Sequence, residues 1–242
     1  MQITGIKTSL FKERADLLDF IKKHISTLDE GDILVVTSKI VALSESRVGK
    51  IEDKNILILK ESKKVIKTPW AMLTLTSQGW SINAGIDESN ADHAIILLPK
   101  NSFETAEMVR KNLKKYFSLK KFGVLITDTR SIPLRVGTIG RAIGYAGFEP
   151  LKSYIGKKDL FGRKSRLTKS NQADALAAGA VAVMGEGDER SPLAIIKNAP
   201  VVFISRSLSA KSNRLAFPPE QDIFSYVFLA NKHARHKNSK KK

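Results

Sequence analysis

The chain has 242 residues, of which 42% are hydrophobic and 27% are charged, a composition typical of a globular protein with a buried core. It has no cysteine, which excludes disulfides, zinc–thiolate centres and cysteine nucleophiles. The formal net charge of +17 favours polyanionic partners, namely nucleotides, phosphorylated cofactors or, nonspecifically, nucleic acid.

The first predicted elements are a helix and a buried strand. Apolar side chains recur at helical spacing over Ala15–Leu28, which predicts an amphipathic helix that ends before Gly31. The apolar run Ile33–Val36 predicts a buried strand, and this strand leads into Thr37, Ser38 and Lys39.

Between residues 55 and 98 the pattern changes from helix to short strands. Asn55–Lys64 resembles a short helix, and the alternation in Met72–Thr76 predicts a strand. The Gly-containing segment Asn83–Asn90 predicts a turn, and another strand is expected at Ala94–Leu98, before Pro99. The turn carries three polar side chains, Asp87, Ser89 and Asn90.

A second polar group follows a basic amphipathic helix predicted at Ser102–Tyr116. The apolar run Gly123–Ile126 predicts a buried strand, and it ends in Thr127, Asp128 and Thr129. A carboxylate at the mouth of an apolar strand lies where α/β-type sheets bind their ligands.

Together, Asp87 and Asp128 with nearby hydroxyl and amide oxygens suit Mg²⁺ or Mn²⁺. The alternative is structural: Asp87 caps a turn, and Asp128 caps whatever follows its strand. Spacing alone does not separate the two interpretations.

The segment Gly137–Gly147 contains four glycines at nearly regular intervals. Glycine allows a backbone to approach either a phosphate or another backbone closely. The segment matches neither the P-loop nor the dinucleotide-binding spacing, and close packing of chain segments explains it equally well.

An Ala-rich helix is predicted at Gln172–Val183, and an acidic loop follows it. Gly185 and Gly187 make this loop flexible, and it carries Glu186, Asp188 and Glu189. Binding of a hard cation would account for these acids, and so would an ordinary solvated loop.

The last residues form a basic tail. Residues 232–242 hold six Lys or Arg and no acid, so subtracting six from +17 leaves +11 for residues 1–231. We predict one domain over 1–231 and a disordered tail over 232–242, with nonspecific nucleic-acid contact as its expected property. Because there is no membrane-spanning apolar run and no signal-peptide pattern, we expect a cytoplasmic protein.

Taken in order, several segments resemble the coenzyme F420-0:L-glutamate ligase family, the gamma-glutamyl ligases of the deazaflavin cofactor. The set covers most of residues 30–197, and it is the order of the segments that makes the resemblance specific. The segments are GDILVVTSKIV, ILKESKKVIKT through NAGIDESN, LLPKNSFETAEMVRKNLKK, VLITDT, AIGYAGFEPLKSYIGKKDLFGR and QADALAAGAVAVMGEGDERSPLAII.

The resemblance implies a mixed α/β (α+β) fold with two interlocked subdomains and an intertwined homodimer. It implies a GTP-dependent ligase that joins L-glutamate, gamma-linked, to a deazaflavin-type carboxylate acceptor with two Mg²⁺ or Mn²⁺ ions, and it leaves open a K⁺ ion. By resemblance, Asp87, Asp128, Thr129 and Glu186 would hold metal. Ser38, Lys39, Asn90, Gly185, Gly187 and Asp188 would contact nucleotide, and Asp87, Asp128 and Lys39 would serve catalysis.

The proposed chemistry suits these residue types. Phosphoryl transfer requires mainly positioning and neutralisation of phosphate charge, which metal ions and cations such as Lys39 and Arg135 would supply. Two other hypotheses stay open. One is a related amino-acid ligase with a different carboxylate acceptor, and the other is a basic nucleic-acid-binding protein on an inactive ligase scaffold.

Overall fold

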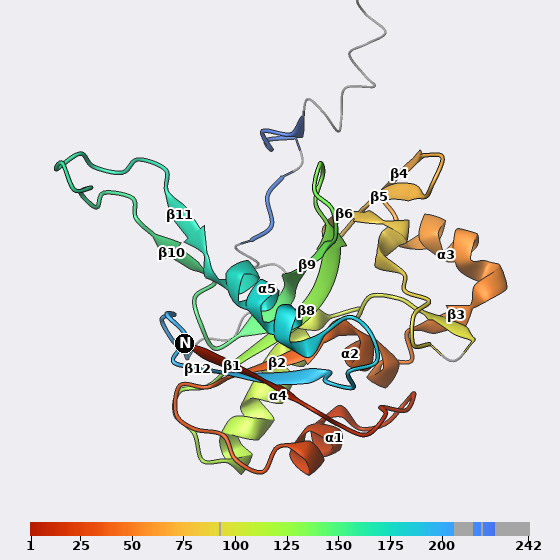
Figure 1. Cartoon of the computed structure of the whole chain (residues 1–242), viewed down its shortest axis with the longest axis horizontal. Coiled ribbons are helices and arrows are strands. Elements are labelled where there is room, and N and C mark those ends of the chain that lie inside the picture. Colours follow the sequence, from red (N-terminus) through yellow and green to blue (C-terminus); the bar gives the residue numbers. More distant parts are fainter. Residues whose placement is uncertain (92, 206–214, 219, 226–242) are drawn as a thin grey trace, which may run out of the picture.

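A five-stranded sheet forms the centre of the protein in the computed structural model, which describes residues 1–91, 93–205, 215–218 and 220–225 (Figure 1). β2 and β8 run parallel, whereas every other neighbouring pair in this sheet is antiparallel. The strands, in sheet order, are β1 (Gln2–Ile6), β12 (Leu193–Lys197), β2 (Ile33–Thr37), β8 (Gly123–Ser131) and β9 (Thr138–Ala146).

Helices cover both faces of this sheet (Figure 1). Leu34 and Val36 of β2 pack in one apolar cluster with α1 (Leu17–His24) and α4 (Ser102–Tyr116). Ile33 and Val35 point to the other face, where they pack with α5 (Gln172–Met184). β2 is therefore buried on both sides, which explains its continuous apolar sequence.

The long predicted helices are confirmed, with shorter ends in one case. α4 has the predicted bounds, and α5 extends one residue beyond the prediction. α1 begins later than predicted because Asp16 is its N-cap, with the Asp16 carboxylate accepting a hydrogen bond from the Asp19 amide.

The glycine-rich segment is mostly strand β9, which the sequence did not predict. A Cβ at Gly140 would approach the Ala177 carbonyl oxygen of α5 to 2.5 Å, and one at Gly144 would approach the Ser102 carbonyl oxygen to 2.6 Å. These glycines therefore allow α5 and the start of α4 to pack directly on β9, which favours the close-packing interpretation.

Residues 38–98 form a second region, which begins at the carboxyl end of β2 (Figure 1). Its elements are α2 (Ser38–Ser44), β3 (Val48–Lys50), α3 (Lys54–Glu61), β4 (Lys64–Lys67), β5 (Met72–Thr76), β6 (Gly79–Ile82) and β7 (Ala94–Ile96). The strands form two small sheets, β3–β7 and β4–β5–β6, on either side of the short helix α3 (Figure 1).

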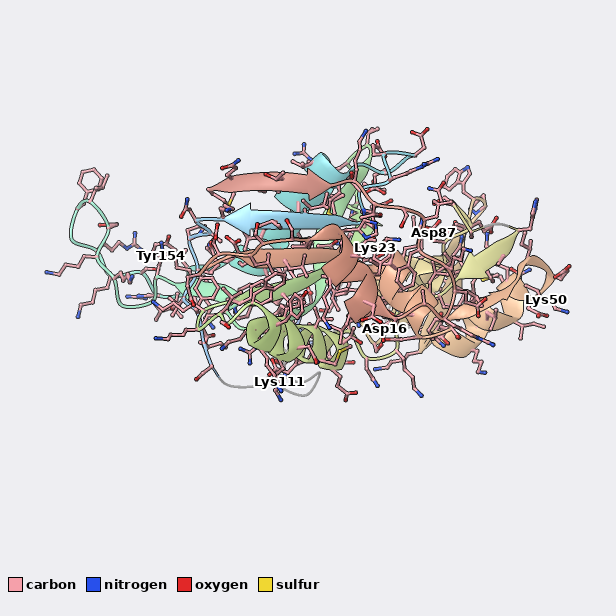
Figure 2. All side chains as sticks on the ribbon, turned by 90° about the horizontal axis from the view of Figure 1, so that it is seen from below. Asp16, Lys23, Lys50, Asp87, Lys111 and Tyr154 are labelled. Carbon is pink, nitrogen blue, oxygen red and sulfur yellow. The ribbon has the colours of Figure 1, made fainter. Side chains whose placement is uncertain are left out.

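A hairpin of β10 (Leu151–Ser153) and β11 (Lys169–Asn171) projects from the main body (Figure 1). Figure 2 shows Tyr154 on this hairpin and Asp87 toward the opposite end of the molecule. The fold is mixed α/β, as predicted. The interlocked subdomains, the homodimer and the single domain over 1–231 stay predictions, and the tail 232–242 lies outside the described residues.

In the described part of the chain, none of the helices has both the length and the apolar character required to cross a lipid bilayer.

Candidate active site

A cavity of about 390 Å³ lies at the carboxyl end of β2, where its parallel pairing with β8 stops. Thr37 and Thr127 form the last pair in this register, so Asp128 and Thr129 of β8 follow directly beside the end of β2. The N-terminal loop, the start of α2, the turn after β6 and the loop after α5 complete the walls. The lining includes Thr8–Phe11, Thr37–Ile40, Leu43, Asp87, Ser89, Asn90, Thr127–Thr129, Val181 and Met184–Pro192.

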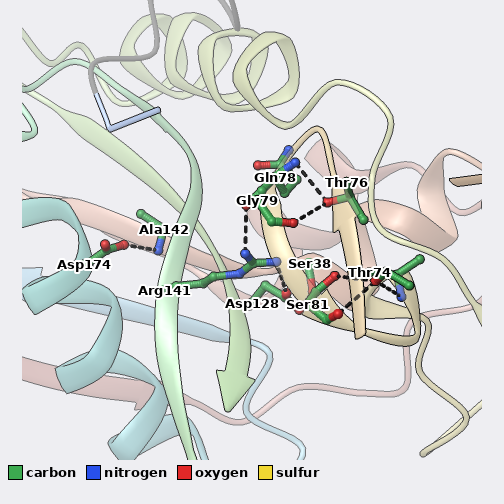
Figure 3. Close-up of polar contacts among 11 residues, drawn as sticks. Ser38, Thr74, Thr76, Gln78, Gly79, Ser81, Asp128, Arg141, Ala142 and Asp174 are labelled. Carbon is green, nitrogen blue, oxygen red and sulfur yellow. Dashed lines mark hydrogen bonds and ion pairs between the residues drawn. The ribbon is translucent and has the colours of Figure 1, made fainter. Parts of the chain in front are cut away.

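Asp128 is anchored on one wall of the cavity by two side chains (Figure 3). The Ser38 hydroxyl donates to one carboxylate oxygen at 3.1 Å, and the Arg141 guanidinium of β9 donates to the other at 3.1 Å. Asp128 lies within β8, opposite Arg141, because the strand continues to Ser131. The alternative in which Asp128 caps a following element is therefore wrong.

Asp87 is held by a different cation and by its own turn. The Lys39 ammonium lies 2.9 Å from one Asp87 oxygen, and the Ser89 amide donates to the other oxygen at 2.7 Å. Lys39 also donates to the Ser89 carbonyl at 2.9 Å. Asp87 thus caps its turn, as the structural interpretation predicted, and it also lines the cavity.

The acidic loop after α5 is hydrogen-bonded to the turn that carries Asp87. Gly185 ends the helix with φ of 82°, a conformation that favours glycine. The Glu189 carboxylate accepts a hydrogen bond from the Gly187 amide at 2.8 Å, and the Asn90 amide group donates to the Gly187 carbonyl at 3.0 Å. Asn90 therefore connects the turn of Asp87 to the loop of Glu186.

Three of the five carboxylates that line the cavity have shifted pKa values. Burial tends to raise the pKa of Asp87, but hydrogen bonds from Lys39 and Ser89 lower it below the usual value. Burial raises the pKa of Asp128 even though Arg141 and Ser38 act against it. Loss of hydration and the negative charge of Asp128 raise the pKa of Glu186. The raised pKa of Glu186 therefore follows first from burial and second from the charge of Asp128.

The donor set suits a hard divalent cation that also binds a phosphate. Carboxylates of Asp87, Asp128 and Glu186 and the hydroxyl-bearing Thr129 all border the cavity. Within the described residues, no three His, Cys, Asp or Glu side chains are placed to hold one ion together. Mg²⁺ usually takes one or two protein carboxylates and fills its remaining positions with water and substrate phosphates, so this arrangement fits it.

All ten residues predicted for the site lie in this one cavity, and the roles assigned to them stay predictions. They are Ser38, Lys39, Asp87, Asn90, Asp128, Thr129, Gly185, Glu186, Gly187 and Asp188.

Two features were missed or misplaced by the sequence interpretation. Arg135, expected as a cationic partner, is not among the cavity's lining residues, and Arg141 pairs with Asp128 instead. Strand β9 was not predicted because of the glycines around Arg141. The Asp128–Arg141 pair follows only from the register of β8 against β9.

Comparison with known proteins gives one consistent result. A family model described as F420-0:Gamma-glutamyl ligase matches residues 5–198. The chain is 35% identical to a coenzyme F420:L-glutamate ligase of Methanococcus maripaludis strain C6, over 93% of this chain and 97% of that protein. It is 34% identical to the enzyme of the same name from Methanocaldococcus jannaschii, over 93% and 96%. For the one from Archaeoglobus fulgidus the identity is 32%, over 79% and 85%.

Proposed function

The chain belongs to the F420-0:gamma-glutamyl ligase family and is a ligase, and from this premise we propose that it joins L-glutamate to coenzyme F420-0 at the expense of GTP. The proposed product carries a gamma-linked glutamate. We further propose two divalent ions, Mg²⁺ or Mn²⁺, as cofactors, and a cytoplasmic homodimer as the active form.

The proposed reaction has two balanced steps. An oxygen of the acceptor carboxylate attacks the γ-phosphorus of GTP, and GDP leaves. The α-amine of glutamate then attacks the carbonyl carbon of the acyl phosphate, inorganic phosphate leaves with its bonding electrons, and the amine loses a proton. Activation is needed because an ionised carboxylate has no adequate leaving group for direct attack by an amine.

In this scheme the protein mainly positions groups and neutralises charge. The divalent ions would neutralise the phosphate oxygens when bound. Ser38 and Lys39 at the end of β2, together with the loop Gly185–Arg190, border the space for the phosphates. The Asn90 link to Gly187 fixes one edge of that loop.

One observation carries the proposal: hydroxyls, a lysine and five carboxylates line one cavity at the carboxyl end of β2, where its parallel pairing with β8 stops. This is the edge at which open α/β sheets bind phosphorylated ligands. The donor set provides cations for phosphate and hard oxygens for divalent ions in the same cavity.

The test is a calorimetric titration of GTP into the protein with and without Mn²⁺, followed by a ligation assay with F420-0 and L-glutamate. We expect GTP binding that requires the ion and a product one glutamate heavier by mass spectrometry. Ion-dependent binding without product on F420-0, but with product on another carboxylate, would support the related ligase with a different acceptor. GTP that does not bind with Mn²⁺ present would overturn the proposal.

A further inference from the structure

The N-terminal loop, residues 8–11, lies between β1 and α1 and forms part of the wall of the cavity (Figure 1). Phe11 of this loop packs edge-on against Phe20 of α1, with 4.9 Å between the ring centroids. Ser9 gives the loop a second anchor on the same helix, because its amide donates to the Nε2 atom of His24 at 3.1 Å. Phe20 and His24 are four positions apart, so one face of α1 holds the loop.

Only one tautomer of His24 fits both of its partners. A backbone amide can only donate, so Nε2 accepts from Ser9 and carries no proton. The proton therefore lies on Nδ1, which donates to the Phe20 carbonyl at 2.9 Å. The Ser9 hydroxyl is 3.2 Å from the same Nε2 atom. One side of the imidazole is thus fixed by α1, and the other side holds Ser9.

The N-terminal loop in turn holds the loop after α5. The Thr8 amide donates to the Arg190 carbonyl at 2.9 Å. Arg190 has a φ of 54°, a left-handed conformation that is uncommon for a residue other than glycine and persists where the surrounding structure fixes it. This contact and the hydrogen bond from Asn90 to the Gly187 carbonyl hold the loop Gly185–Arg190 at two points.

Building on the proposed function, we propose that His24 is a positioning residue for the nucleotide. By holding Ser9, it keeps the N-terminal loop in place and, through Thr8, the end of the loop Gly185–Arg190 that borders the space for the phosphates. A loop that is already ordered loses less conformational freedom when a ligand binds, so its anchor contributes to affinity without touching the ligand. His24 itself is not among the residues that line the cavity.

The alternative role of His24 is local to α1. Its ring packs on Phe20, with 4.5 Å between centroids, and its Nδ1 hydrogen bond lies within the last turn of the helix. This local role needs neither Nε2 nor Ser9. The two roles therefore depend on opposite sides of the imidazole, and variants that keep one side can separate them.

The experiment compares His24→Gln with His24→Asn. The side-chain amide of glutamine extends about as far as Nε2 and can accept from Ser9, whereas that of asparagine extends only about as far as Nδ1. In calorimetric titrations with Mn²⁺ present, His24→Asn should bind GTP roughly fivefold more weakly than the wild type, the effect of one hydrogen bond. His24→Gln should stay within about twofold of the wild type. In ligation assays, His24→Asn should raise the KM for GTP and leave kcat nearly unchanged.

The chain offers a matched control in Asn112→Ala. Like His24, Asn112 donates from its side chain to the carbonyl four residues earlier, that of Met108, at 2.8 Å, but it lies on α4 and outside the cavity. This variant should leave GTP affinity unchanged. If Asn112→Ala weakened GTP binding as much as His24→Asn, general loss of helix stability would account for the effect, and the inference would be overturned.

The remaining outcomes separate the inference from the proposed function. Unchanged GTP affinity in folded His24→Asn, or equal losses in His24→Asn and His24→Gln, would overturn the inference and leave the ligase proposal standing. A lowered kcat with an unchanged KM for GTP would do the same. A wild-type protein that does not bind GTP with Mn²⁺ present would overturn both. If His24→Asn fails to fold, His24→Phe takes its place, because it keeps an aromatic ring but has no acceptor for Ser9, and the same fivefold loss is expected.

Discussion

Glu30 and Glu186 lie at opposite ends of the same parallel strand pair, and their surroundings are opposite too. Glu30 precedes β2 at its amino end, and its two carboxylate oxygens accept the backbone amides of Lys120 and Lys121 just before β8, at 2.5 and 2.7 Å. Glu186 lies beyond the carboxyl ends of β2 and β8, in the loop that borders the cavity. One carboxylate joins two loops, and the other lines a cavity together with further carboxylates.

The pKa shifts of the two residues follow from these partners. Backbone hydrogen bonds from Lys120 and Lys121 lower the pKa of Glu30, because they favour its charged form. Loss of hydration and the charges of Asp128 and Asp87 raise the pKa of Glu186, because they disfavour its charged form. At the amino end, backbone amides stabilise the negative charge of Glu30. At the carboxyl end of β2, several carboxylates line one cavity, and a bound cation would stabilise their negative charge.

The largest expected effect comes from removing the charge of Asp128. Asp128→Asn keeps oxygen and amide groups near Ser38 and Arg141 but takes away the anionic ligand. We expect kcat to fall by about a hundredfold or more, equivalent to roughly 2.7 kcal/mol of transition-state stabilisation. Steady-state ligation kinetics, with circular dichroism to verify the fold, measure this. Activity close to that of the wild type would remove Asp128 from the proposed metal site.

Asp128→Ala is a poorer variant for this purpose. It would leave the buried guanidinium of Arg141 without its carboxylate, and breaking a buried pair from one side costs about 3–5 kcal/mol. We therefore expect the alanine variant to lose stability as well as activity. Asp128→Asn also removes the charge that compensates Arg141, but it keeps a hydrogen-bond acceptor and the side-chain volume, so urea denaturation should show a smaller decrease in midpoint for the asparagine variant than for the alanine variant.

The second prediction concerns the pH dependence of ion binding at Glu186. Because its pKa is raised, Glu186 takes up a proton at a higher pH than an ordinary glutamate, whose pKa is about 4.3. Divalent ions bind the ionised form, so Mn²⁺ affinity should fall as the pH decreases through this raised pKa. Glu186→Gln should weaken Mn²⁺ binding roughly tenfold at neutral pH, about 1.4 kcal/mol, and remove that pH-dependent component.

A matched control is Glu104→Gln, which removes the same charge from the exposed surface of α4 outside the cavity. It should leave both the Mn²⁺ affinity and its pH profile unchanged. If Glu186→Gln and Glu104→Gln weakened Mn²⁺ binding equally, the change in net charge alone would account for the effect. Glu186 would then not be a ligand of the ion.

The sequence predicted the carboxyl end of the pair better than the strands around it. Apolar runs revealed β2 and β8 because both are buried, and the polar residues that follow them marked the cavity. β9 was missed because its glycines replace the apolar alternation that identifies a strand. The Asp128–Arg141 pair depends on cross-strand register, which spacing along one chain does not encode.

The smallest expected effect is at the amino end. Glu30→Gln replaces one of the two carboxylate acceptors by an amide donor, so the amides of Lys120 and Lys121 are no longer both satisfied by this side chain. A glutamate with a lowered folded-state pKa contributes stability above its unfolded pKa, and this contribution is lost as the pH falls through the folded value. The variant should therefore have a slightly lower Tm at neutral pH, and this difference should vanish as the pH falls through the lowered pKa of Glu30.

Thermal denaturation of both proteins between neutral and acidic pH measures this, with Glu13→Gln as the control. Glu13 is exposed and pairs with the exposed Arg14 at 3.5 Å, so its replacement should leave Tm nearly unchanged across the range. Glu30→Gln should also leave Mn²⁺ binding intact, because it acts at the other end of β2 and β8. If it instead weakened ion binding as Glu186→Gln does, the two ends would be coupled through the strands, and the carboxyl end would not function independently of its scaffold.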